Sequence, residues 1–206
     1  MPRFRFRPNP HNPYDVRYLQ ASAGETTTPE YLAINPRGKV PVLRDGDIIV
    51  HESLAIMAYL DRRFPDPPLF GTTPTQTGHV WQRILEFANY ADDPMRSIIL
   101  PLYFDTAEAR AAEIHAARKP AHDELALLEH ALSGADWLCC KPLSAADIAI
   151  YPVTKSLQRA ASKKAAPQFN LQVLPIAAHY PRIDAWMARI EALPNYERTY
   201  LPHWRA

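Results

Sequence analysis

Cysteine and glycine are scarce in this sequence, and each scarcity excludes a class of protein. The 206 residues include only 2 cysteines, the neighbours Cys139 and Cys140. Adjacent cysteines build neither a disulfide framework nor a Cys-x-x-Cys metal knuckle, so we expect two buried thiols in a reducing compartment. The 6 glycines form no G-x-G-x-x-G and no G-x-x-x-x-G-K-[ST] motif. Rossmann-type and P-loop nucleotide binding therefore lack their main sequence support.

An excess of one charge and long apolar runs are also missing. Lys plus Arg number 23 and Asp plus Glu number 22, a formal net charge of +1. This balance argues against a large surface for nucleic acid or anionic membranes. No apolar run approaches the ~18 residues of a membrane span, and the first residues lack the apolar core of a secretory signal. We expect a cytoplasmic protein that binds neither nucleic acid nor membrane.

Proline, by contrast, is abundant: its 21 copies divide the chain into short elements. Residues 1–64 favour a small α/β domain, the Pro-rich segment 65–71 a linker, and residues 72–206 an all-helical domain. In the first domain we expect strands over 14–20, 40–43 and 47–50, and helices over 28–35 and 53–64. In the second we expect helices over 75–90 with a broken continuation to 103, over 107–132 with an interruption at Pro120, over 144–160 and over 181–193.

The segment from Asn35 to Ile56 carries the most chemical information. Pro41 has no N–H and holds Val40 extended; with a cis Val40–Pro41 peptide, Val40 can turn its N–H and C=O towards an extended ligand. Glu52 and Ser53 open the next helix, whose free N–H groups suit a carboxylate while Glu52 suits an ammonium. The amino-acid end of a small peptide satisfies both. Taken singly, each feature also has a purely structural explanation, a turn at Pro41 and a helix cap at Glu52–Ser53.

Taken together, these motifs resemble the glutathione-binding half of the cytosolic glutathione transferases, in a bacterial, theta- or beta-like form. A second motif supports the resemblance independently: Ser144 and Asp147 have the spacing of a capping box, similar to the one buried in the helical domain of that family. The resemblance implies a thioredoxin-like N-terminal α/β domain, here incomplete, followed by an all-α domain. It also implies glutathione as co-substrate, held by Lys39, Val40, Pro41, Glu52 and Ser53.

The start of the chain departs from the family pattern. In the family a strand and a helix precede the position of Pro13–Tyr14, and the loop between them carries the Tyr, Ser or Cys that serves the glutathione thiol. Such a unit needs on the order of 25 residues, whereas 12 residues precede Pro13. The catalytic residue is therefore not assigned. Its open candidates are His11, Asn12, Tyr14, a backbone N–H, Arg96 and Tyr103.

The helical domain has candidate residues for a co-substrate pocket and for a metal site. Aromatic residues at helical intervals form a domain core or line an apolar pocket for an electrophile, and we assign Tyr90, Arg96 and Tyr103 to that pocket. Histidines recur at 115, 122 and 130, but without a H-E-x-x-H motif, so no metal is expected.

The resemblance implies a glutathione S-transferase that conjugates the thiol to a hydrophobic electrophile in detoxification, as a homodimer in the cytoplasm. The alternatives are a non-catalytic glutathione-transferase-like binding or assembly protein, and a truncated gene product without the catalytic residue.

Overall fold

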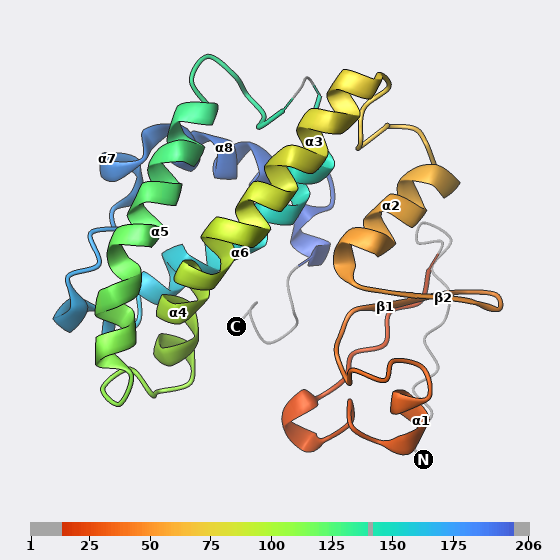
Figure 1. Cartoon of the computed structure of the whole chain (residues 1–206), viewed down its shortest axis with the longest axis horizontal. Coiled ribbons are helices and arrows are strands. Elements are labelled where there is room, and N and C mark those ends of the chain that lie inside the picture. Colours follow the sequence, from red (N-terminus) through yellow and green to blue (C-terminus); the bar gives the residue numbers. More distant parts are fainter. Residues whose placement is uncertain (1–13, 140–141, 200–206) are drawn as a thin grey trace. The chain divides into compact units, whose positions relative to one another are not determined.

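The computed structural model describes residues 14–139 and 142–199, and the chain divides after Arg63 into two units (Figure 1). Unit 1 holds a 3-10 turn, Ala21–Ala23, a short helix α1 (Pro29–Leu32), two strands and the helix α2 (Ser53–Arg63). Thr28 caps α1 by accepting a hydrogen bond from the Tyr31 N–H at 3.3 Å. Pro29 at the first helical position and Glu30 in the first turn complete the N-terminal signal expected from the sequence.

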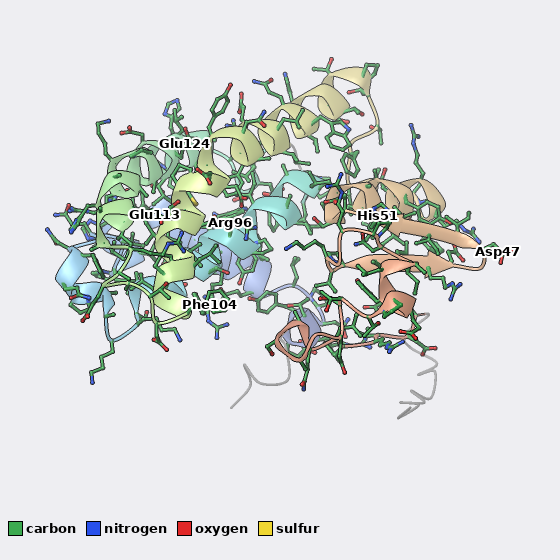
Figure 2. All side chains as sticks on the ribbon, turned by 60° about the horizontal axis from the view of Figure 1, so that its bottom comes forward. Asp47, His51, Arg96, Phe104, Glu113 and Glu124 are labelled. Atoms are coloured by element: carbon green, nitrogen blue, oxygen red, sulfur yellow. The ribbon has the colours of Figure 1, made fainter. Side chains whose placement is uncertain are left out.

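The two strands of unit 1, β1 (Val42–Asp45) and β2 (Ile48–His51), form an antiparallel hairpin. The pairs Val42–His51 and Asp45–Ile48 set the register and leave Gly46 and Asp47 as a two-residue loop. Gly46 has φ +59°, a left-handed conformation that glycine adopts without steric cost. Asp47 lies at the tip of the hairpin and His51 at its far end (Figure 2). The hairpin is confirmed, but both strands begin later than expected.

The expected strand over 14–20 is wrong, because residues 15–20 have no regular structure and Tyr14 lies in a bend. The alternating apolar pattern is present, but a strand also needs a neighbour for its N–H and C=O groups. Within the described residues the sheet has only β1 and β2, and neither pairs with this segment.

The regular structure of unit 2 consists of helices in the residues that the structure describes. A long segment runs through α3 (Pro74–Glu86), a π-helical turn (Phe87–Ala91) and α4 (Asp92–Tyr103). It is followed by α5 (Ala111–Ala131), α6 (Ala145–Ala161), a 3-10 turn (Ala166–Phe169), α7 (Ile176–His179), α8 (Pro181–Glu191) and a last 3-10 turn (Tyr196–Thr199). In Figure 1, α4 packs between α5 and α6, while α3 lies along α6.

The core of unit 2 consists of apolar side chains that these helices turn towards one another. Each such burial contributes roughly 1.5–3 kcal/mol. Those on the central helices are almost fully buried: Val80, Ile84, Met95, Ile98, Leu102, Ile114, Leu125, Ile150, Leu157, Ile183 and Trp186. The expected class, a small α/β unit followed by an all-α unit, is confirmed.

Pro120 does not interrupt α5, contrary to expectation. A proline inside a helix removes the hydrogen bond to the carbonyl four residues earlier, here that of Ala116. Both residues are exposed, so water can hydrate the released carbonyl. The helix therefore continues from Ala111 to Ala131.

The Ser144–Asp147 capping box at the start of α6 is confirmed and lies entirely in the core. Asp147 is 0% exposed. One carboxylate oxygen accepts the N–H and the hydroxyl of Ser144 at 2.9 and 2.7 Å. The other accepts the Leu138 N–H and the Trp186 indole N–H, both at 2.9 Å. The Asp147 side chain thus joins α6 to α8 and to the loop that precedes α6.

The N-cap of α3 gives a first prediction. Thr73 accepts a hydrogen bond from the Gln76 N–H at 3.2 Å, and losing such a cap costs ~1 kcal/mol. We expect Thr73→Ala to lower the thermal midpoint by ~2–4 °C, measured by far-UV circular dichroism. Thr75→Ala in the first turn of α3 is the control; it removes no cap, and alanine is the better helix former. An equal loss in both variants would contradict the role of Thr73.

Candidate functional site

The residues that the sequence assigns to glutathione gather at one end of the hairpin of unit 1. The last strand pair joins Val42 to His51. Val40 and Pro41 directly precede β1, and Glu52 and Ser53 directly follow β2, so both stretches adjoin this last pair. The register therefore brings together two stretches that are separated in sequence by the whole hairpin.

Val40 offers its main chain to solvent. Its peptide bond to Pro41 is cis, the conformation that lets Val40 turn its N–H and C=O towards an extended ligand. The residue is 58% exposed. Within the described part of the chain, the main chain of Val40 makes no hydrogen bond. An extended ligand can pair there as an additional strand would.

Glu52 and Ser53 lie directly after β2, where α2 begins. Glu52 has φ +72°, a left-handed conformation that costs a non-glycine residue about 1–3 kcal/mol and is concentrated at functional sites. Its carbonyl accepts the first helical hydrogen bond, from the Ile56 N–H at 2.9 Å. Its exposed carboxylate pairs with no described residue. The N–H groups of the first turn stay free for an anion.

Lys39 precedes this group, and its ammonium has no ion-pair partner among the described residues. Its main-chain carbonyl, in contrast, accepts two hydrogen bonds, from the Tyr31 hydroxyl at 2.6 Å and the Asn35 side-chain amide at 2.7 Å. Tyr31 and Asn35 were not predicted from the sequence as part of the site. The available signal was a tyrosine and an asparagine four residues apart, at the end of a short helix.

Among the candidates for activating the thiol, Tyr14 lies in the described part of unit 1. Tyr14 is exposed, and its hydroxyl has no partner in the described part of the chain. His11 and Asn12 lie outside the described residues. The group that activates the thiol stays a prediction.

The three residues assigned to the co-substrate pocket lie along one helical segment of unit 2. Tyr90 is 63% exposed in the π-helical turn. Arg96 on α4 (Figure 2) pairs with Asp92 one turn earlier, at 2.6 Å. Tyr103 ends α4. Its hydroxyl is buried and has no hydrogen-bond partner among residues 14–139 and 142–199, and the Lys163 ammonium lies 4.8 Å from its ring centroid.

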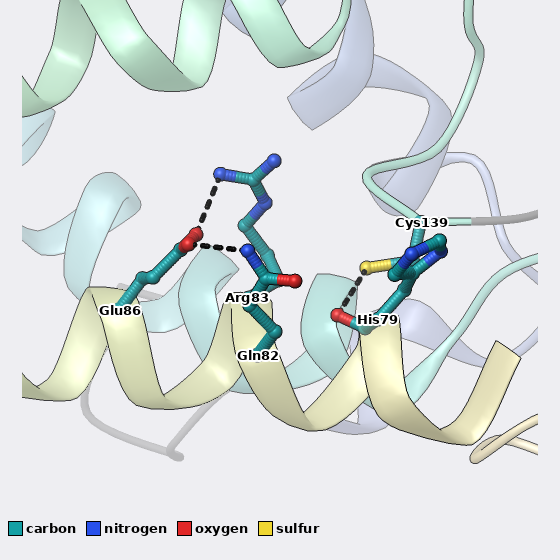
Figure 3. A network of polar contacts seen from close by, with 5 residues as sticks. All are labelled: His79, Gln82, Arg83, Glu86 and Cys139. Atoms are coloured by element: carbon teal, nitrogen blue, oxygen red, sulfur yellow. Dashed lines mark hydrogen bonds and ion pairs between the residues drawn. The ribbon is translucent and has the colours of Figure 1, made fainter. Parts of the chain in front are cut away.

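A hollow of about 280 Å³ does exist in unit 2, but it does not include those three residues. Its lining comes from α3 and the loop before α6: His79, Gln82, Arg83, Glu86, Leu138 and Cys139 (Figure 3). Gln82 and Arg83 both donate to Glu86, at 2.7 and 3.1 Å, so its charged groups satisfy one another. Cys139 contacts the His79 carbonyl at 3.6 Å; Cys140 lies outside the described residues.

The histidines of α5 have structural neighbours. His122 makes hydrogen bonds to the Tyr180 hydroxyl and, at 2.7 Å, to the Leu171 carbonyl, and His115 packs on the ring of Phe169. Burial, reinforced by the nearby carboxylates of Glu129 and Asp123, raises the pKa of Tyr180. Over residues 14–139 and 142–199, no three His, Cys, Asp or Glu side chains are grouped to hold a metal ion. None of the described helices is long and apolar enough to cross a membrane.

Comparison with known proteins assigns the family. The family model of the glutathione S-transferase N-terminal domain matches residues 11–68, and that of the glutathione S-transferase C-terminal domain matches residues 92–194. The chain therefore belongs to the glutathione S-transferase family, and unit 1 is the family's thioredoxin-like domain. Glu52, Ser53 and the Val40–Pro41 peptide all lie within the first matched region.

Individual relatives agree with this assignment. The chain is 34% identical over 139 residues to glutathione S-transferase F10 of Arabidopsis thaliana, an alignment that covers 65% of each chain. A glutathione S-transferase structure from Pseudomonas fluorescens is 27% identical, with a TM-score of 0.71 over 89% of this chain and 85% of that one. The fold also matches a glutathione S-transferase-I bound with lactoylglutathione, with a TM-score of 0.74 at 22% identity, over 91% of this chain and 86% of that one.

Proposed function

We propose that this chain is a glutathione transferase that binds glutathione on unit 1. The observation that carries the proposal is the group at the end of the hairpin: the Val40 main chain and the Glu52 carboxylate, neither of which has a partner among the described residues, and the start of α2. Pairing along Val40 suits the cysteinyl backbone of the tripeptide. Glu52 suits its ammonium, and Ser53 with the first turn of α2 suits its α-carboxylate.

The remaining assignments follow from this placement. Lys39 pairs with a second carboxylate of the ligand, and Pro41 keeps the extended backbone free of a competing donor. The hydrophobic electrophile uses side chains of the helical domain, for which Tyr90, Arg96 and Tyr103 are our assignment. As in the matched family, we propose a homodimer in the cytoplasm.

The proposed reaction is a displacement or addition at an electrophilic carbon. The glutathione thiol gives its proton to solvent or to a protein acceptor, and the thiolate sulfur forms a bond to carbon. In a displacement, the leaving group departs with the electron pair of the bond that breaks. In an addition, the π bond of the electrophile breaks and its electron pair takes up a proton. A free thiol has a pKa near 8.5, so only a few per cent is thiolate at neutral pH. Binding contributes by orienting the sulfur and by stabilising its charge.

The test is direct. Isothermal titration with glutathione measures binding, and conjugation of glutathione to 1-chloro-2,4-dinitrobenzene, followed by absorbance, measures transfer. Binding together with turnover above the uncatalysed rate is the expected result. Binding without turnover would identify a glutathione-binding protein that lacks the transfer step. No binding to the folded chain would overturn the proposal.

A further inference from the structure

Asn35 is the centre of the loop that leads to Val40. It is only 1% exposed, although asparagine is a polar residue that is mostly found at the surface. Its N–H donates to the Tyr31 carbonyl at 2.8 Å, and its carbonyl accepts the Gly38 N–H at 2.9 Å. Its side chain accepts the Arg37 N–H at 3.1 Å and donates to the Lys39 carbonyl at 2.7 Å.

The loop is also confined from its other side. Gly38 has φ +60°, and a Cβ at this position would lie 3.0 Å from the carbonyl oxygen of Thr26. Only glycine combines this conformation with such a close approach. The chain from Asn35 to Lys39 therefore has one well-defined path, although it contains no regular structure.

The two hydrogen bonds on the Lys39 carbonyl also set the direction of Val40. A carbonyl oxygen has two lone pairs, and Tyr31 and Asn35 occupy both. The Lys39–Val40 peptide is planar and trans, so the N–H of Val40 points away from that carbonyl. Pro41 has no N–H. The direction of the Val40 N–H is thus fixed, and this donor has no hydrogen-bond partner within the described residues.

We infer that Tyr31 and Asn35 are positioning residues for glutathione: they hold the Lys39 carbonyl and thereby aim the Val40 N–H at the cysteinyl carbonyl of the tripeptide. The inference rests on the proposed function. A donor fixed before binding loses less conformational entropy when the ligand arrives. Glu52 and Ser53, which bind the other end of the ligand, do not depend on the two hydrogen bonds to the Lys39 carbonyl.

The test uses Tyr31→Phe, which removes one of the two donors and keeps the ring. The control is Tyr59→Phe. Tyr59 is also in unit 1, and its hydroxyl donates to Asp45 at 2.9 Å, away from the Val40 loop. We expect glutathione to bind Tyr31→Phe about fivefold more weakly by isothermal titration, since one net hydrogen bond corresponds to roughly that factor. Tyr59→Phe should bind as the wild type does.

A second readout separates positioning from general damage to unit 1. In ¹H–¹⁵N spectra of the wild type, adding glutathione should shift the amide signals of both Val40 and Ser53. In Tyr31→Phe at saturating glutathione, the shift at Val40 should shrink while that at Ser53 stays.

Three outcomes overturn the inference. Unchanged affinity in Tyr31→Phe removes the positioning role. Equal loss of both amide shifts shows a structural role instead. A wild-type chain that fails to bind glutathione overturns the proposed function itself, and the role of Tyr31 with it; this outcome is visible before any variant is made.

Discussion

Asp147→Ala is expected to destabilise unit 2 by about 4 kcal/mol or more. The substitution leaves four buried donors without an acceptor, on Leu138, Ser144 and Trp186. Each unsatisfied buried group costs ~1–3 kcal/mol, so four such groups together account for a loss of this size. In a chain of this size the thermal midpoint should fall by ~10 °C or more.

Urea unfolding followed by far-UV circular dichroism measures this effect, because nearly all long helices belong to unit 2. Asp93→Ala is the matched control: Asp93 is an exposed acid in the first turn of α4. It should change stability by no more than about 0.5 kcal/mol. If the two variants unfold at the same urea concentration, the carboxylate of Asp147 does not hold the core together.

Glu52→Gln is expected to weaken glutathione binding by about 10- to 100-fold. Glutamine has the same shape and size as glutamate, so the substitution does not disturb the left-handed backbone at φ +72°. It removes only the negative charge that we propose to face the ligand's ammonium. Hydrogen bonds to charged groups contribute ~1.5–3 kcal/mol, which corresponds to this range of Kd.

A change in the ligand isolates that contact. N-acetylated glutathione has no ammonium, so the wild type and Glu52→Gln should bind it with similar affinity. Glu30→Gln, at an exposed acid in the first turn of α1, should bind glutathione as the wild type does. A Glu52→Gln chain with undiminished affinity for glutathione would show that the ammonium lies elsewhere.

The elements that could be predicted from the sequence depend on local signals. Thr28–Pro29–Glu30 starts a helix, and Ser144 with Asp147 forms a capping box, because both patterns satisfy backbone groups within four residues. The hairpin followed from Asp45–Gly46 between apolar runs. The grouping of Val40 with Glu52 and Ser53 followed from the family resemblance, and the register of β1 and β2 brings the two stretches together.

The features that were missed depend on what lies elsewhere in space. The segment 14–20 has a strand pattern, but neither of the two strands in the described residues pairs with it. Pro120 is tolerated because it faces water, which its sequence neighbourhood does not reveal. The double hydrogen bond from Tyr31 and Asn35 to Lys39 requires the exact path of a loop without periodicity, and no pattern encodes that path.

The burial pattern of unit 1 links its folding to its ligand. In residues 14–63 no large apolar side chain is buried, and the best-buried residues are Thr26 and Asn35. Such a domain draws little of its stability from a hydrophobic core. A molecule that binds only its folded form adds RT ln(1 + [L]/Kd) to that stability, about 2.7 kcal/mol at a hundred times Kd. Bound tripeptide would then stabilise the folded form of this unit, and raising its concentration would raise the temperature at which the unit unfolds.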